Sequence, residues 1–121
     1  TGNKIEDFGI GFFTKYGDGG VDISPIGDLL KSEVFLLAKE LKIINDIQNA
    51  EPTDGLWNDR RIDTEQIGAT YNQIEWAMHN LEKSDLTAIE KNIIKIYQEH
   101  HTKNKHKMKP IPVCIIPEKM K

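Results

Sequence analysis

Apolar residues recur every three to four positions in three stretches of the chain, and this spacing constrains the fold more than any other feature. Such a period gives each helix one apolar face and predicts a mostly helical structure. The first stretch, from Leu30 to Leu41, predicts an amphipathic helix with one buried face. Ser32 is its expected N-cap, because a serine hydroxyl can accept a hydrogen bond from a free N–H of the first turn. Pro25 and Gly27 oppose any extension towards the N-terminus.

Two further helices and one short turn are predicted nearer the C-terminus. Residues 63–67 are followed by Gly68, which predicts a single helical turn closed by the glycine. Asp85 is the expected cap of the last helix. Residues 50–62 have no period and indicate an exposed loop. The apolar positions are Ile74, Ala77, Met78 and Leu81 in one helix, and Leu86, Ile89, Ile93, Ile96 and Tyr97 in the other.

The charge balance excludes several function classes. The 121 residues carry 16 basic and 19 acidic side chains, a net charge of −3, so no global field attracts nucleic acid or an anionic membrane. No apolar run reaches the length of a membrane span, and no charged-then-apolar leader is present. We therefore expect no nucleic-acid or membrane partner and a cytoplasmic location. A single cysteine excludes an intrachain disulfide.

Two segments near the N-terminus carry candidate ligand-binding groups. The loop from Lys15 to Asp22 holds a cation, two carboxylates and three glycines, so its backbone could approach a ligand closely while charges orient that ligand. An ordinary glycine turn is the alternative. Glu6 and Asp7 offer hard oxygen ligands that suit magnesium, although adjacent carboxylates on a solvated helix start are commoner.

Lys31 lies at the start of the first predicted helix, where the helix dipole disfavours a cation. A phosphate bound there by free N–H groups and the Lys31 ammonium would reverse that penalty. A solvated lysine is the alternative.

His100, His101 and His106 lie close to Lys107 and Lys109. Their spacing does not match a zinc signature, and lysines without interleaved aromatic residues are more typical of a solvated tail than of a nucleic-acid patch. Capture of one phosphate by a lysine and an imidazole is a third possibility.

Several segments together resemble one family, the ammonia-dependent NAD synthetases. The resemblance covers essentially all of the chain, and its motifs occur in the family's order. They are Thr1-Gly2-Asn3-Lys4, residues 11–22 (GFFTKYGDGGVD), residues 25–29 (PIGDL) with Lys31, residues 52–57 (PTDGLW), residues 63–68 with Tyr71, and His106-Lys107.

This resemblance implies a fold class and an activity. The family has a doubly wound α/β fold, so the chain would be the mostly helical C-terminal portion of a parallel-sheet domain of the ATP pyrophosphatase type. Its members work as homodimers and use ATP and Mg²⁺ to amidate nicotinic acid adenine dinucleotide (deamido-NAD) with ammonia, by way of an adenylated intermediate.

The resemblance also implies residue roles. ATP would be contacted by Thr1, Lys31 and Thr53, and Mg²⁺ by Glu6. Asp18 would bind ammonium and help it lose a proton. The chain has one more residue between the Glu6 region and Lys15 than many relatives, so Asp7 competes with Glu6 for the metal. The expected deamido-NAD contacts are Lys15, Asp22, His106 and Lys107.

One family motif is absent. The family grips the ATP pyrophosphate with a Ser-Gly-Gly-x-Asp-Ser loop, which these 121 residues lack. We therefore expect residues 1–121 to be the C-terminal portion of a longer enzyme, inactive alone, with a mobile tail over about 102–121 that covers substrate. The alternatives are a non-catalytic helical interaction or dimerisation fragment, and another amide-forming ATP pyrophosphatase.

Overall fold

The computed structural model describes residues 2–53 and 62–121, and regular structure in these residues is entirely helical. This confirms the predicted helical character. A parallel sheet is not part of the described residues and stays a prediction. The elements are the π-helix η1 (Ile5–Gly9), the α-helices α1 (Lys31–Glu40), α2 (Asn45–Gln48), α3 (Asp63–Ile67), α4 (Tyr71–His79) and α5 (Ala88–Asn104), and the 3₁₀ turn η2 (Glu118–Met120).

Helix α1 forms where the apolar period predicts it, but its start differs. The N-cap is Leu30 rather than Ser32, so the predicted cap is wrong. The Glu33 carboxylate folds back and accepts a hydrogen bond from the Leu30 N–H at 2.7 Å, which fixes the entry into the first turn. Ser32 lies within that turn, and its N–H donates to Oε1 of Glu75 on α4 at 2.9 Å.

Helices α4 and α5 each begin with a reciprocal cap. Thr87, not Asp85, caps α5: its hydroxyl accepts from the Glu90 N–H at 3.2 Å, and the Glu90 carboxylate accepts from the Thr87 N–H at 2.7 Å. Thr70 and Gln73 make the same pair of contacts at the start of α4. Helix α3 ends at Gly68 with φ of +80°, which confirms the predicted glycine stop.

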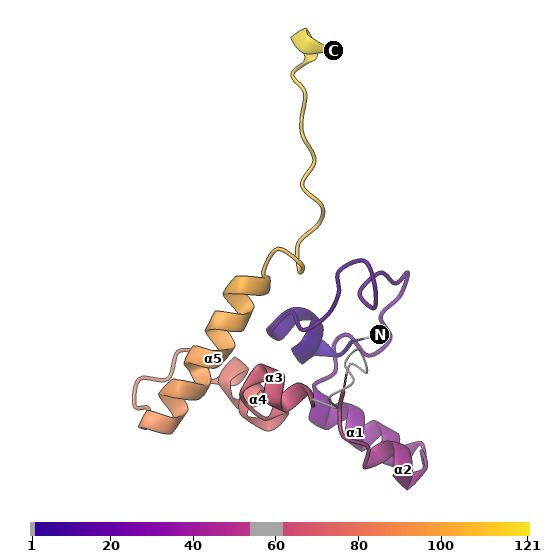
Figure 1. The fold of residues 1–121 in the computed structure, drawn as a ribbon, viewed down its shortest axis with the longest axis vertical. Helices are drawn as coiled ribbons and strands as arrows, with labels where there is room; N and C mark the ends of the chain where they lie inside the picture. Colours follow the sequence, from indigo (N-terminus) through magenta and orange to yellow (C-terminus); the bar gives the residue numbers. More distant parts are fainter. Residues whose placement is uncertain (1, 54–61) are drawn as a thin grey trace.

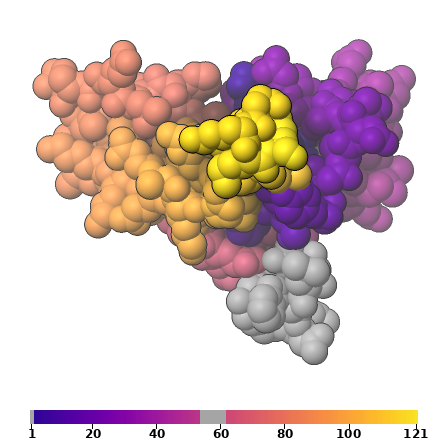
Figure 2. Space-filling view, turned by 90° about the horizontal axis from the view of Figure 1, so that it is seen from above, coloured from indigo at the N-terminus to yellow at the C-terminus, as the bar shows by residue number. Residues whose placement is uncertain are grey.

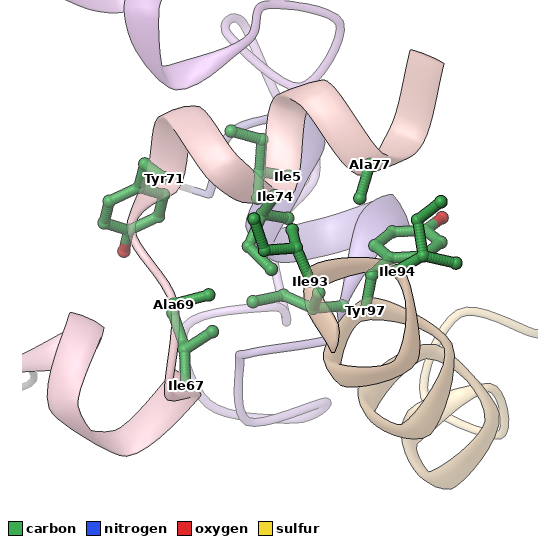
Figure 3. Packing of buried hydrophobic residues seen from close by; sticks show 10 residues of the cluster. Ile5, Ile67, Ala69, Tyr71, Ile74, Ala77, Ile93, Ile94 and Tyr97 are labelled. Carbon is green, nitrogen blue, oxygen red and sulfur yellow. The ribbon is translucent and has the colours of Figure 1, made fainter. Parts of the chain in front are cut away.

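The core lies where α4 and α5 pack against each other and against η1 (Figure 3). Side chains of α4 and α5 point inward onto Ile5 from η1, which is fully buried. Leu81 and Ile89 were predicted on the apolar faces, but both are largely exposed, since Leu81 lies beyond the end of α4 and Ile89 lies in the first turn of α5. The buried apolar residues are Ile5, Ile10, Ile67, Ala69, Tyr71, Ile74, Ala77, Ile93, Ile94 and Tyr97.

The apolar face of α1 is not buried within the described residues, contrary to the sequence prediction. Helix α1 packs against α4 at its start and against the short α2, and neither α1 nor α2 contains a buried residue. Figure 1 shows both helices projecting from the body of the molecule. An apolar surface therefore faces outward on this arm. Its exposed residues are Phe35, Leu36, Leu37, Leu41, Ile43, Ile44 and Ile47.

The C-terminal segment leaves the body after α5. Helix α5 continues to Asn104, so residues 102–104, the first of the predicted tail, are helical. From about residue 110 the chain has no regular structure until η2 and extends away from the helices (Figure 1). Figure 2 looks along this segment and shows it rising between α5 and the N-terminal part of the chain. Among the described residues, every helix is too short or too polar to span a lipid bilayer.

Candidate functional site

The glycine-rich loop and the segment after α5 enclose two adjoining clefts. One, of about 460 Å³, is lined by residues of 13–24 and of 107–111, together with Gly2, Asp7 and Phe8. The other, of about 890 Å³, is lined by residues 13–16 and by 106–112 in part. The predicted deamido-NAD and ammonium residues all line one cleft or both. They are Lys15, Asp18, Asp22, His106 and Lys107.

Two lysines join the walls of these clefts. Nζ of Lys107 donates to the carbonyl oxygens of Gly11 at 3.0 Å and Phe13 at 2.9 Å. In the opposite direction, Nζ of Lys15 donates to the carbonyls of His106, at 3.0 Å, and Lys109. Burial lowers the pKa of Lys107. The base of the C-terminal segment is thus held to the glycine loop by charge-assisted hydrogen bonds.

Asp18 orders the glycine loop from within. Its Oδ1 accepts a hydrogen bond from the Thr14 N–H at 2.7 Å, and the Thr14 carbonyl accepts from the N–H groups of Gly17 and Gly19, each at 3.0 Å. A Cβ at Gly19 would lie 2.4 Å from the Phe13 ring, so a larger residue there would displace that ring. Asp18 therefore has a structural role in the loop besides its predicted contact with ammonium.

Glu6 and Asp7 both lie in the π-helix η1. The N–H of Ile10 donates to the carbonyl of Ile5 at 2.8 Å, five residues back, whereas an α-helix spans four. Such single wide turns occur frequently at functional sites. Glu6 contacts Lys31, while Asp7 lines the glycine-loop cleft, so the two carboxylates serve different parts of the site.

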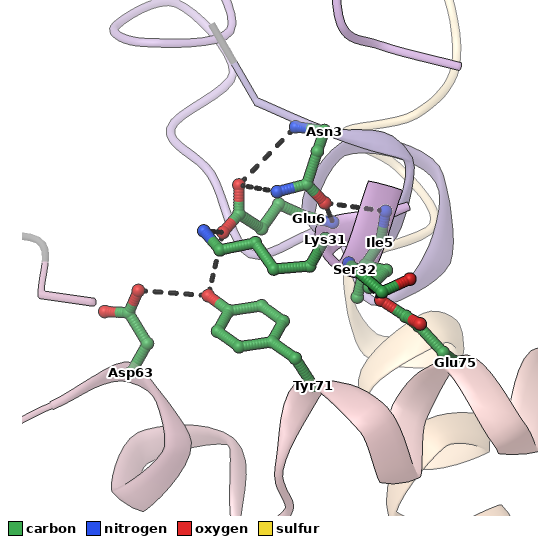
Figure 4. A network of polar contacts seen from close by, with 8 residues as sticks. All are labelled: Asn3, Ile5, Glu6, Lys31, Ser32, Asp63, Tyr71 and Glu75. Atoms are coloured by element: carbon green, nitrogen blue, oxygen red, sulfur yellow. Dashed lines mark hydrogen bonds and ion pairs between the residues drawn. The ribbon is translucent and has the colours of Figure 1, made fainter. Parts of the chain in front are cut away.

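Glu6 is the centre of a polar network that joins four elements (Figure 4). Its Oε1 pairs with Nζ of Lys31 at 3.1 Å and accepts from the Tyr71 hydroxyl at 2.7 Å, while Oε2 accepts from the Asn3 amide at 2.8 Å. The Tyr71 hydroxyl also lies 3.0 Å from Oδ2 of Asp63. Nζ of Lys31 lies 4.7 Å from the centre of the Tyr71 ring, within range of a cation–π contact.

Burial and charge affect two groups beside Glu6. Burial, followed by the carboxylates of Glu6 and Asp63, raises the pKa of Tyr71, so this phenol stays protonated and acts as a donor. Burial and the Glu6 charge likewise raise the pKa of Asp7. The Oδ1 atom of Asp7 is buried and accepts no hydrogen bond within the described residues.

These carboxylates are compatible with magnesium. In the described parts of the chain no group of three or more potential metal ligands occurs. Magnesium commonly binds through one or two carboxylates, with substrate phosphates and water completing the octahedron. Glu6, or Asp7 with its unpartnered oxygen, therefore fits a site that is completed by a nucleotide.

Lys31 and Thr53 line one hollow of about 310 Å³, together with residues 34–38 and 47–52 in part. The structure thus brings together two of the three predicted ATP contacts. The third, Thr1, lies outside the described residues, as does the 54–61 part of the predicted loop. Only 19% of the Lys31 side chain is exposed, so the alternative of a solvated lysine is wrong.

The anion at the start of α1 is the protein's own Glu75 carboxylate, bound to the Ser32 N–H. Sequence reasoning missed Glu75, and it assigned no role to Asn3 or Tyr71. For Asn3 a signal exists, because an asparagine just before a helix commonly caps it, and Oδ1 of Asn3 accepts from the Ile5 N–H at 3.0 Å.

The three histidines near the end of α5 bond to backbone rather than to one another. His100 contacts the Ile67 carbonyl at 3.0 Å, His101 the Gly9 carbonyl at 2.7 Å, and His106 the Lys103 carbonyl at 3.2 Å. His100 and His101 thereby join α5 to α3 and η1. His106 remains at the rim of the larger cleft.

Comparisons with known proteins indicate the family of this chain. The family model of NAD synthase matches residues 1–111. The NH(3)-dependent NAD(+) synthetase of Archaeoglobus fulgidus is 39% identical over 111 residues, which cover 92% of this chain and 44% of that protein. The corresponding enzyme of Syntrophomonas wolfei is 35% identical over 121 residues, 100% of this chain and 45% of that protein.

A solved structure is also similar. The NMN synthetase from Francisella tularensis superposes with a TM-score of 0.76 at 32% identity, over 98% of this chain and 45% of that one. The chain therefore spans less than half the length of these relatives. Since the family model covers most of its residues, the chain belongs to the NAD synthase family.

Proposed function

We propose that this chain is the C-terminal part of an ammonia-dependent NAD synthetase, which converts deamido-NAD, ATP and ammonia into NAD, AMP and pyrophosphate. The observation that carries the proposal is the grouping of the candidate residues. Those expected to hold deamido-NAD and ammonium line the glycine-loop clefts, and Lys31 and Thr53 line a separate hollow. Two substrates with distinct charge patterns require two such sites.

The chemistry explains why both sites are needed. A carboxylate resists attack by ammonia because its charge repels nucleophiles and hydroxide leaves poorly. In the first step a carboxylate oxygen of deamido-NAD attacks the α-phosphorus of ATP, and pyrophosphate leaves. In the second step ammonia attacks the carbonyl carbon, and AMP leaves with the carboxylate oxygen. Ammonium must lose a proton before this attack, and Asp18 is the proposed acceptor.

On the nucleotide side, Lys31, Thr53 and Thr1 would contact ATP. Lys31 would exchange its ion pair with Glu6 for a phosphate, since the two side chains neutralise each other in the structure. Glu6, or Asp7, would hold Mg²⁺, which when bound offsets the charge that develops on the phosphates.

On the deamido-NAD side, the cations of Lys15 and Lys107, with His106, would pair with the phosphates. The Asp22 carboxylate would accept hydrogen bonds from hydroxyl groups of the same substrate. Residues 110–121 would form the mobile part of the tail and close over the cleft that Pro110 and Ile111 line.

The rest of the enzyme would complete the site. We propose that it contains the parallel sheet and the pyrophosphate-binding loop, and that the active form is a cytoplasmic homodimer. The apolar surface of α1 and α2, defined above, supports burial of this arm against another part of the assembly.

The test is product analysis by chromatography and mass spectrometry with the complete protein. Deamido-NAD, ATP, Mg²⁺ and ammonia should give NAD, AMP and pyrophosphate. Because a similar structure is named an NMN synthetase, nicotinic acid mononucleotide is the matched comparison substrate, and preferential use of it would overturn the dinucleotide assignment.

The isolated 121-residue chain should form no NAD. Turnover by the isolated chain would refute its proposed dependence on the rest of the enzyme, and no amidation by the complete protein would favour a non-catalytic fragment.

A further inference from the structure

The Tyr71 hydroxyl connects two carboxylates that are far apart in sequence. It lies 2.7 Å from Oε1 of Glu6 in η1 and 3.0 Å from Oδ2 of Asp63 in α3, and because a phenol has one proton to donate, we assign that proton to the shorter contact, with Glu6. Its ring lies beneath the ammonium of Lys31 from α1. One residue at the start of α4 thus contacts both the proposed Mg²⁺ ligand and the proposed phosphate ligand (Figure 4).

We propose that Tyr71 is a positioning residue, which keeps the Glu6 carboxylate oriented after Lys31 turns to bind phosphate. This inference rests on the proposed function, because it assigns Glu6 to the metal and Lys31 to ATP. No role for Tyr71 in the reaction itself is required.

Glu6 would retain hydrogen bonds at both of its oxygens after Lys31 leaves. Lys31 and Glu6 are largely shielded, with 19% and 16% of their side chains exposed, so their ion pair persists until another anion competes for Lys31. When that ion pair separates, Oε1 still accepts from the Tyr71 hydroxyl, while Oε2 accepts from the Asn3 side-chain amide at 2.8 Å and from the Asn3 backbone N–H at 3.5 Å. A carboxylate held at both oxygens retains its orientation, whereas one held at a single oxygen can rotate about that contact.

The hydroxyl can be separated from the ring by substitution. Tyr71 is 7% exposed and its ring belongs to the core, so Tyr71→Phe keeps the packing and the cation–π contact with Lys31 and removes only the hydroxyl group. Tyr97 on α5 is also 7% exposed and stacks on His101, away from Glu6. Tyr97→Phe is therefore a matched control for the loss of one buried phenolic hydroxyl.

The test uses the complete enzyme and Mn²⁺ in place of Mg²⁺. Mn²⁺ bound in the presence of ATP is measured by the loss of the free-ion electron paramagnetic resonance signal. Tyr71→Phe should weaken Mn²⁺ binding about tenfold, the size expected when one hydrogen bond to a charged group is lost. The KM for deamido-NAD should stay close to that of Tyr97→Phe, and Tyr71→Phe should remain folded at the assay temperature.

Three results would overturn the proposal. They are wild-type Mn²⁺ affinity in Tyr71→Phe, an equal loss of affinity in Tyr97→Phe, and unfolding of Tyr71→Phe near the assay temperature, which would make the hydroxyl purely structural. Failure of the proposed function is distinguishable, since the wild-type enzyme would then make no NAD. If the wild type makes NAD but Glu6→Gln binds Mn²⁺ normally, the assignment of Glu6, and Tyr71 with it, is wrong.

Discussion

Alanine substitutions at Gly11 and Gly68 test how tightly Gly11 packs against the end of α5, because each substitution adds one methyl group. Both have positive φ, +63° at Gly11 and +80° at Gly68. A Cβ at Gly11 would lie 2.5 Å from Cβ of Asn104 and 3.0 Å from Cε of Met108. A Cβ at Gly68 would meet no heavy atom of the described residues within 4 Å. Alanine at either position has the energetic cost of a positive φ, but only alanine at Gly11 also clashes with Asn104 and Met108.

The magnitudes follow from that difference. A non-glycine residue in the left-handed region costs about 1–2 kcal/mol, which is the full expected cost of Gly68→Ala. Gly11→Ala adds overpacking against a Cβ on the α5 backbone, which cannot rotate away, at about 1–3 kcal/mol. The total for Gly11→Ala is therefore about 2–5 kcal/mol.

The assay is urea unfolding of the complete enzyme, followed by tryptophan fluorescence. Gly11→Ala should also raise the KM for deamido-NAD, because the Gly11 carbonyl accepts a hydrogen bond from Lys107. Gly68→Ala should leave that KM unchanged. Equal losses of unfolding free energy in the two variants would show that α5 does not pack tightly on Gly11 and would refute this account of how the cleft is closed.

Three further predictions concern the proposed ligands. Lys31→Ala should raise the KM for ATP and slow adenylation by an amount equivalent to about 1.5–3 kcal/mol, and wild-type kinetics with a much lower melting temperature would contradict a phosphate role. A double alanine variant of His106 and Lys107 should raise the KM for deamido-NAD more than that for ATP, whereas an equal rise for both would indicate an effect on folding or dimerisation. Glu6→Gln should raise the Mg²⁺ concentration that gives half-maximal rate, and Asp7→Asn should leave it unchanged; the reverse result would make Asp7 the ligand.

Local signals predicted much of the fold. The apolar period gave all three long helices, and Gly68 gave the end of α3, because these features depend on residues a few positions apart. The cap of α5 is also readable in the sequence, since Thr87 and Glu90 have the spacing of a reciprocal cap, whereas Asp85 is followed three residues later by Ala88. The start of α1 was harder to predict from nearby residues, because the Ser32 N–H donates to Glu75 from another helix.

The connections within the site depend on contacts between distant residues. Lys107 donates to carbonyls more than 90 positions away, which no motif spacing reveals. Tyr71 occupies an apolar-face position of α4, so its sequence context predicts a core residue and gives no sign of its bond to Glu6. The sequence predicts that Glu6 and Asp7 compete for the metal, but the π-helix that contains both, and the different contacts of the two carboxylates, required the structure.

The central claim, amidation through an adenylated intermediate, can be tested most directly by isotope transfer. The complete enzyme is supplied with deamido-NAD carrying ¹⁸O in its nicotinate carboxylate, and the AMP formed is examined by mass spectrometry. If the carboxylate oxygen attacks the α-phosphorus, the label must appear in the AMP phosphate as NAD accumulates. Formation of NAD with unlabelled AMP, or with ADP and phosphate in place of AMP and pyrophosphate, would contradict the account.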